Sequence, residues 1–180
     1  MNISISKAIL EGARVLREAG VAEARREAGS VLAYAVGRDW TFVVTHADEP
    51  LQTEAIETFR TLIERRAAGE PLQYITGHQE FFKLDFELTS DVLIPRPETE
   101  LIVEIALELL KGDPDPFIAD IGTGSGCIAI SLLHELRDAR AIATDISPAA
   151  HRIAQRNADR HGVGNRLTLV ESDCFQPAIH

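Results

Sequence analysis

Three glycines that alternate with small hydroxyl residues form the most informative segment of the chain, residues 117–129. It reads Phe-Ile-Ala-Asp-Ile-Gly-Thr-Gly-Ser-Gly-Cys-Ile-Ala, with Asp120 two positions before Gly122. An apolar run that meets glycines before a second apolar run predicts a buried strand that turns sharply into a helix. Because glycine lets a ligand approach the main chain, this turn indicates a site for an adenosine-bearing cofactor.

A second acidic residue, Asp145, ends the next expected strand, 19 residues after Gly126. A carboxylate there can accept hydrogen bonds from both hydroxyls of an adenosine ribose, and it disfavours a ribose 2′-phosphate. The alternative role is a negative charge that favours the start of the following helix. Position and spacing together favour the ribose role and argue against an NADP-type ligand.

A third acidic residue follows the third expected strand, in the pair Ser172-Asp173. The carboxyl ends of neighbouring parallel strands converge on one crevice, so Asp173 can accept a hydrogen bond from the exocyclic amine of adenine. Cys174 and Phe175 can then lie against the adenine ring. Alternatively, Asp173 is a solvated turn residue, and Cys174 and Phe175 belong to the core. The sequence does not decide between these two sets of roles.

The residue that separates two cofactor classes is Asp120. The spacing Gly124-x-Gly126-x-x-Ala129 also fits a dinucleotide fingerprint, so NAD is an alternative ligand. A carboxylate aimed at a pyrophosphate would repel it, whereas the same carboxylate suits the ammonium and the sulfonium of S-adenosylmethionine. The residues therefore favour S-adenosylmethionine over NAD.

The elements that must position these residues alternate between helix and strand from Pro95 onward. We expect strands at 117–121, 141–144 and 167–170, with helices before and between them. Ser147-Pro148 is a capping residue followed by a first-turn proline. This order predicts a parallel, doubly wound sheet with the three acidic residues at one edge.

The first third of the chain has a different pattern. Apolar residues recur at helical spacing within 5–16, 24–35 and 56–63, which predicts a small helical bundle. Alternating Phe82, Leu84, Phe86 and Leu88 then predict a strand, and 92–94 is a candidate return strand. We therefore expect helices over 1–72, a β-hairpin linker over 73–94 and a second domain over 95–180.

Composition narrows the class of protein. Of the 180 residues, 45% are apolar, enough for a core, and the net charge of -10 argues against a broad nucleic-acid surface. Cys127 and Cys174 have neither metal-ligand nor disulfide spacing, which suits reduced thiols in the cytosol. No segment resembles a signal peptide or a membrane span. We expect a cytoplasmic protein without a metal site, a membrane segment or direct nucleic-acid binding.

A family resemblance rests on several segments together. Asp120-x-Gly122-x-Gly124-x-Gly126 with Asp145 resembles the class I S-adenosylmethionine methyltransferases. Gly-Glu-Pro-Leu-Gln-Tyr-Ile-Thr-Gly at 69–77, Leu-Ile-Pro-Arg-Pro-Glu-Thr-Glu at 93–100 and Ala-Gln-Arg-Asn-Ala at 154–158 resemble the bacterial glutamine methyltransferases of peptide chain release factors, the PrmC/HemK family. The resemblance covers essentially the whole chain. It implies an α/β fold with a helical bundle, a β-hairpin linker and a Rossmann-like catalytic domain.

The resemblance also implies an activity in translation termination. Family members transfer a methyl group from S-adenosylmethionine to the side-chain amide nitrogen (N5) of the glutamine in the Gly-Gly-Gln motif of class 1 release factors. The helical domain would help to dock the release factor, and the full-length protein would be monomeric. A methyltransferase of a nucleic-acid exocyclic amine is the alternative within enzymes. The implied cofactor contacts in this chain are Asp120, Gly122, Thr123, Gly124, Ser125, Gly126, Asp145, Asp173 and Cys174.

The chain departs from the family pattern in two places. The family's acceptor motif, Asn-Pro-Pro-Tyr after a fourth strand, does not occur in these 180 residues, so no catalytic residue is assigned. We therefore expect a C-terminally truncated chain with an incomplete Rossmann-like domain that is inactive alone, or a non-catalytic binding module. Cys174 stands where many members carry a larger aromatic residue, which weakens its assignment as an adenine contact.

Overall fold

The chain forms two compact units, residues 1–76 and 77–180. Their architecture comes from a computed structural model that describes residues 3–173. Each unit has its own apolar core, and each is described by itself. None of the described helices combines the length and the apolar character that crossing a bilayer requires.

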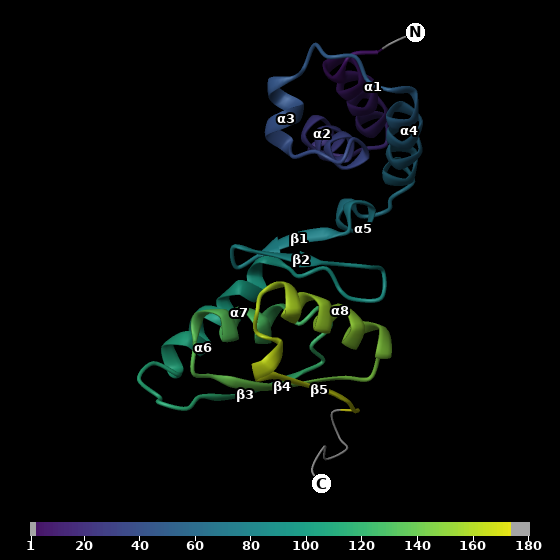
Figure 1. Ribbon diagram of the computed structural model, residues 1–180. Helices are drawn as coiled ribbons and strands as arrows, with labels where there is room; N and C mark the ends of the chain where they lie inside the picture. The colour runs from purple at the N-terminus through teal and green to yellow at the C-terminus, as the bar shows by residue number, and fades with distance from the viewer. Residues whose placement is uncertain (1–2, 174–180) are drawn as a thin grey trace. The chain divides into compact units, whose positions relative to one another are not determined.

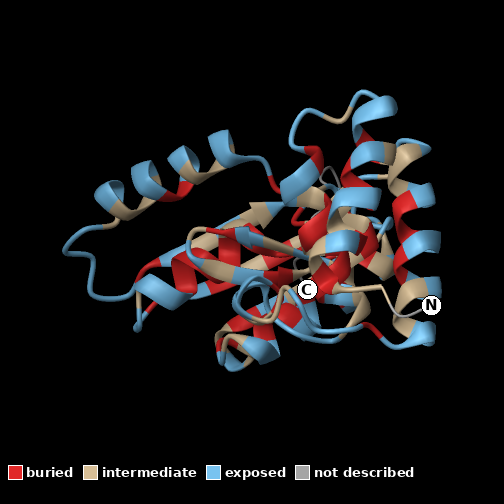
Figure 2. Ribbon diagram, turned by 90° about the horizontal axis from the view of Figure 1, so that it is seen from above, coloured by how far each residue is buried: buried red, intermediate tan, exposed pale blue. Residues whose placement is uncertain are grey.

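The first unit is a bundle of helices, as the spacing of its apolar residues predicted (Figure 1). Its core residues lie along one side of each long helix, and exposed residues line the other side (Figure 2). Ser4 caps the first helix by accepting a hydrogen bond from the Lys7 N–H, and Asp39 caps the third through the Phe42 N–H. The helices are α1 (Ile5–Glu18), α2 (Ala24–Ala35), α3 (Trp40–Thr45), α4 (Thr53–Ala67) and α5 (Leu72–Thr76).

The second unit begins with an antiparallel hairpin of β1 (His78–Phe81) and β2 (Leu84–Glu87). Our expectation of one strand across Phe82 and a return strand at 92–94 was wrong. Phe82 and Lys83 form the turn, with φ of 48° and 62°, which matches the twist of a two-residue hairpin. The Phe82 N–H donates to Glu100 Oε1 at 2.8 Å. The turn contains no glycine, and a contact distant in sequence supports it.

A three-stranded parallel sheet follows, in the order β3-β4-β5. The strands are β3 (Phe117–Ile121), β4 (Arg140–Asp145) and β5 (Leu167–Glu171). The helices between and before them are α6 (Glu100–Leu109), α7 (Cys127–Glu135) and α8 (Pro148–Arg160), with single 3-10 turns at η1 (Pro97–Thr99) and η2 (Gly164–Arg166). The expected α/β fold, with a helical N-terminal part and a partial parallel sheet, is confirmed.

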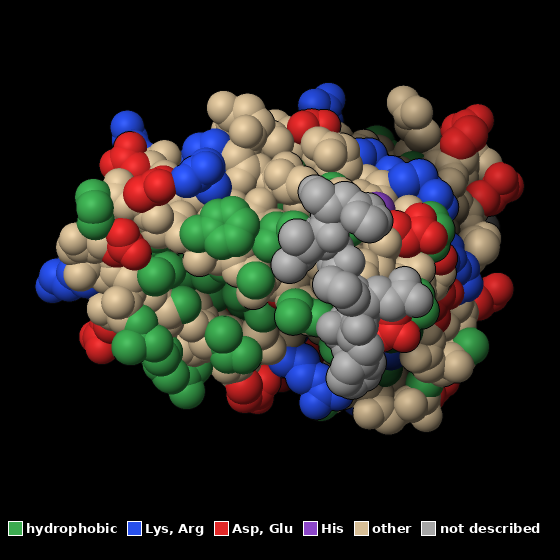
Figure 3. Space-filling model, turned by 90° about the horizontal axis from the view of Figure 1, so that it is seen from below, with side chains coloured by type: hydrophobic (Ala, Val, Ile, Leu, Met, Phe, Trp, Pro, Cys, Tyr) green, Lys and Arg blue, Asp and Glu red, His purple; other side chains and the backbone are tan. Residues whose placement is uncertain are grey.

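All three of these helices lie on one face of the sheet (Figure 1). The doubly wound arrangement is therefore present on one side only, because no element within residues 3–173 covers the other face. On that side Phe117 and Ile121 are 63% and 62% exposed. Figure 3 shows apolar side chains gathered on this face. Strand β3 forms one edge of the sheet, and its carboxyl end leads directly into the glycine loop.

Candidate functional site

The glycine loop joins β3 to α7 in a conformation that requires glycine. Gly122, Gly124 and Gly126 have φ of 78°, 54° and 81°, in the left-handed region that other residues rarely adopt. The N–H groups of Gly122 and Thr123 both donate to Thr144 O, at 2.8 and 2.9 Å. The loop is therefore anchored to the end of the neighbouring strand β4.

The three glycines have two different roles. A side chain at Gly122 or Gly124 would meet no atom within 4 Å, so the main chain there is open to an approaching ligand. A Cβ at Gly126 would lie 2.7 Å from Ile130 Cδ1, so this glycine allows close packing at the start of α7. Open backbone at the first two positions fits a bound cofactor.

Asp120 lies beneath the loop and holds it to α7. Its Oδ2 atom accepts hydrogen bonds from Thr123 Oγ1 at 2.7 Å and from the Ala129 N–H at 3.3 Å. Burial raises the pKa of Asp120 above its ordinary value; the bonds from Thr123 and Ala129 partly offset this rise, and the charge of Asp145 adds to it. A desolvated carboxylate is thus present, and the Thr123 hydroxyl is used to orient it.

Asp145 ends β4 and links three segments of the site. Its Oδ2 accepts from the Gly124 N–H at 2.9 Å, and its Oδ1 accepts from the Ser147 N–H at 3.0 Å. The second bond supports the start of α8, which was the alternative role that the sequence left open. Since a carboxylate offers about four acceptor positions, room for two further donors remains. Its ribose role stays a prediction.

Three further predicted cofactor contacts are Ser125, Asp173 and Cys174. Ser125 is buried in the loop, with its side chain away from solvent. The Ser172 N–H donates to Asp145 O at 3.1 Å, which brings the residue before Asp173 to the edge where β4 ends. Asp173 itself is exposed. Cys174 lies outside the described residues.

Sequence reasoning assigned no role to Asn157, although its side chain is completely buried in the sheet-containing unit. Its side chain bonds to the main chain of Glu87 and to the carbonyl of Ser125. One signal was available: Asn157 falls on the same helix face as Ala150, Ile153 and Ala154, all of which are buried. A polar residue on an apolar helix face needs buried partners.

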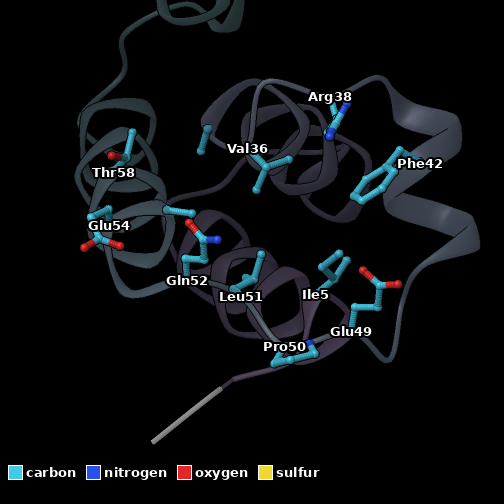
Figure 4. A pocket seen from close by; sticks show the side chains of 12 residues that line it. Ile5, Val36, Arg38, Phe42, Glu49, Pro50, Leu51, Gln52, Glu54 and Thr58 are labelled. Carbon is cyan, nitrogen blue, oxygen red and sulfur yellow. The ribbon is translucent and has the colours of Figure 1, made fainter.

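The helical unit has a hollow of its own, of about 400 Å³ (Figure 4). Apolar Ile5, Val36 and Leu51 share its wall with charged Arg38 and Glu49. Sequence reasoning assigned no chemistry to these residues. Within residues 3–173, no three His, Cys, Asp or Glu side chains gather as a metal site would require.

Two protein families match separate parts of the chain. The PrmC N-terminal domain matches residues 7–77, and a precorrin methyltransferase domain matches residues 99–177. The first match ends at residue 77, next to the division between the helical unit and the sheet-containing unit.

Curated relatives extend over nearly the whole chain. A release factor glutamine methyltransferase of Moorella thermoacetica is 46% identical over 175 residues, which cover 97% of this chain and 62% of the relative. Those of Burkholderia pseudomallei and Geobacter sulfurreducens are 48% and 46% identical, with 83% and 90% of this chain and 54% and 56% of the relatives covered. The chain thus spans less than two thirds of the length of these relatives.

Solved structures match more loosely. A ribosomal protein L11 methylase from Lactobacillus delbrueckii subsp. bulgaricus is 27% identical with a TM-score of 0.43, covering 51% of this chain and 46% of that one. An RNA methyltransferase from Salinibacter ruber, in complex with S-adenosyl-L-homocysteine, is 29% identical with a TM-score of 0.39, covering 46% and 52%.

Proposed function

We propose that the chain belongs to the family of release factor glutamine methyltransferases and that it carries the cofactor site of such an enzyme. The reaction is transfer of a methyl group from S-adenosylmethionine to the side-chain amide nitrogen (N5) of the glutamine in the Gly-Gly-Gln motif of class 1 release factors. One observation carries the proposal: two carboxylates, Asp120 and Asp145, converge on an open glycine loop.

Each residue has a distinct role in the proposed site. Asp120 receives the ammonium of the methionine part, and Asp145 receives the ribose hydroxyls with its two remaining acceptor positions. The open main chain at Gly122 and Gly124 lets the cofactor lie close to the loop. Asp173 accepts from the adenine amine. The bound cofactor supplies the electrophilic methyl group, and these residues supply orientation and charge.

The charge of the site supports S-adenosylmethionine over NAD. Asp120 and Asp145 both face the loop, and the nearby Asp145 adds to the rise in the pKa of Asp120. A pyrophosphate would bring further negative charge to a place that already holds two carboxylates. A positively charged methionine end relieves the same repulsion.

The rest of the proposal concerns the whole protein. Residues 1–72 help to dock the release factor, 73–94 form a hairpin linker and 95–180 belong to the cofactor-binding domain. The release factor is the partner, and the protein is a cytoplasmic monomer when full length. The net charge of -10 supports a protein substrate over a nucleic acid, because broad phosphate binding needs a basic surface.

Calorimetry tests the cofactor part of the proposal. The purified chain is titrated with S-adenosylhomocysteine, which retains the ammonium and the adenosine, and separately with NAD. We expect heat of binding with S-adenosylhomocysteine only. Preferential binding of NAD would overturn the cofactor assignment.

A labelling experiment tests the substrate. Protein expressed from the natural gene is incubated with methyl-labelled S-adenosylmethionine and a release factor, either intact or with the Gly-Gly-Gln glutamine changed to alanine. DNA and RNA are offered in parallel. We expect label in the intact release factor alone. Label in nucleic acid alone would show that the substrate is an exocyclic amine of a base.

A further inference from the structure

A single buried side chain, Asn157 of α8, connects the hairpin to the glycine loop. Asn157 Oδ1 accepts from the Glu87 N–H at 2.8 Å, and Nδ2 donates to Glu87 O at 3.0 Å. The same Nδ2 atom donates to Ser125 O at 2.9 Å. Both protons of the amide are therefore used, one on each of two segments that lie 38 positions apart in sequence.

The contact with Glu87 imitates strand pairing. In an antiparallel ladder a residue exchanges an N–H and a C=O with its partner, and here the side-chain amide of Asn157 supplies both groups. Glu87 is the last residue of β2. The amide thus holds the end of the hairpin against α8.

The contact with Ser125 completes the anchoring of the glycine loop. The loop is already tied at Gly122 and Thr123 by Thr144 O, and at Gly124 by Asp145. The bond from Asn157 orients the Ser125 carbonyl, which lies between the two glycines nearest α7. The loop is therefore ordered by contacts from β4 and from α8.

We propose that Asn157 is a positioning residue that couples the hairpin to the cofactor loop, so that the seating of the hairpin on α8 sets the loop geometry for cofactor binding. The inference rests on the proposed function for its ligand. Its physical reason is that a buried amide with all protons paired has one favourable orientation. Displacement of either segment leaves a buried polar group unpaired, so the two segments favour one joint arrangement.

Arg156 offers a matched control on the same helix. Its guanidinium pairs with the Glu87 carboxylate, with Nη2 to Oε1 at 2.8 Å. This ion pair also joins the hairpin to α8, but Arg156 is exposed, and the hydrogen bonds that it makes within residues 3–173 go to the Glu87 carboxylate and not to the loop. Arg156→Gln therefore weakens the hairpin contact without touching the Ser125 carbonyl.

The test compares Asn157→Ala, Asn157→Asp and Arg156→Gln with the wild-type chain. Asn157→Asp keeps the size and an acceptor for the Glu87 N–H, but it has no amide proton for Glu87 O or for Ser125 O. Amide hydrogen exchange is measured in the loop and at Glu87 without ligand, and affinity for S-adenosylhomocysteine is measured where circular dichroism shows native helix content. Asn157→Asp keeps the test decisive if the alanine variant fails to fold.

For Asn157→Asp we expect loop amides to exchange about tenfold faster and affinity to fall about tenfold, because the loop loses one of its hydrogen bonds, the bond to Ser125 O. Arg156→Gln should leave both within about twofold. Loop exchange that stays unchanged in Asn157→Asp overturns the coupling, as does an equal change in Arg156→Gln. If the wild type binds no S-adenosylhomocysteine but the loop still loosens, the coupling is supported and the proposed function fails.

Discussion

Asp120 offers a direct test because its structural role and its proposed ligand-binding role respond differently to one isosteric change. Asp120→Asn keeps a carbonyl oxygen that can accept from Thr123 Oγ1 and from the Ala129 N–H, and it removes the buried negative charge. Asp120→Ala removes the acceptor as well. Thr123 is 6% exposed and Ala129 is fully buried, so both donors then lose their partner away from water.

The magnitudes separate the two variants. Each unpaired buried donor costs about 1–3 kcal/mol, so Asp120→Ala, which leaves two of them, should lower the free energy of unfolding by about 2–6 kcal/mol. Asp120→Asn should leave this free energy unchanged or raise it at neutral pH. Loss of a charge-assisted bond to the ammonium costs about 1.5–3 kcal/mol. Asp120→Asn should therefore weaken binding of S-adenosylhomocysteine roughly 10- to 150-fold.

The pH dependence has a definite sign. Burial raises the pKa of Asp120 above 3.8, so between that value and the raised pKa the folded chain binds more protons than the unfolded chain. The contribution of Asp120 to stability therefore falls as the pH rises through this window and stays low above it. Asp120→Asn does not titrate. The difference in unfolding free energy should thus shift towards the variant as the pH rises from about 4 to 7.

The assay must report on the sheet-containing unit. The single tryptophan, Trp40, lies in the helical unit, so its fluorescence is unsuitable. Opening free energies from amide exchange in β3 and α7 report locally, and calorimetry gives the affinity. A loss of stability in Asp120→Asn that grows with pH would refute the desolvation argument, and unchanged affinity would refute the ammonium role.

Substitutions at four further residues test other parts of the sheet-containing unit. Asp145→Ala should weaken S-adenosylhomocysteine binding by about 1–3 kcal/mol in calorimetry; unchanged affinity would mean that the ribose contact is misplaced. Gly126→Ala should lower the free energy of unfolding in urea by about 2–4 kcal/mol, because backbone strain is added to a clash with Ile130. Gly122→Ala should lower it by only about 1 kcal/mol, the strain alone. Equal losses in the two variants would contradict this difference. Arg166→Ala should lower the free energy of unfolding by about 2 kcal/mol, because the guanidinium donates to three carbonyls at and just beyond the end of α7. Arg166→Lys should lower it less. An alanine variant with unchanged stability would exclude this anchoring role.

The site could be predicted where residue type alone restricts conformation. The glycine positions were found because positive φ demands glycine, and all three have it. Asp120 was found from its place two residues before the first glycine, and Asp145 because it ends an expected strand. Parallel pairing brings these two strand ends together. Thr123 and Ser125 were placed in the loop correctly, but their burial depends on neighbours distant in sequence.

The secondary structure was mispredicted or left ambiguous where the local sequence signal is weak. The turn at Phe82 and Lys83 carries no glycine or proline signal, and it is supported by Glu100, 18 positions later. Alternation of apolar residues was therefore read as one continuous strand. The short helix α3 around Trp40 was left ambiguous, since six residues give too little periodicity to identify a helix.

By itself, the sequence determined the succession of helices and strands from Pro95 onward, the glycine loop and the carboxylates at its borders, because these depend on local periodicity and on the conformational freedom of glycine. Only the tertiary structure decided how those parts are held. It placed the Gly124 N–H on Asp145, the Thr123 hydroxyl on Asp120 and the Asn157 amide between hairpin and loop. The bonds of Gly124 and Asn157 join residues 21 and 32 positions apart in the chain, and their partners are selected by the burial that packing imposes.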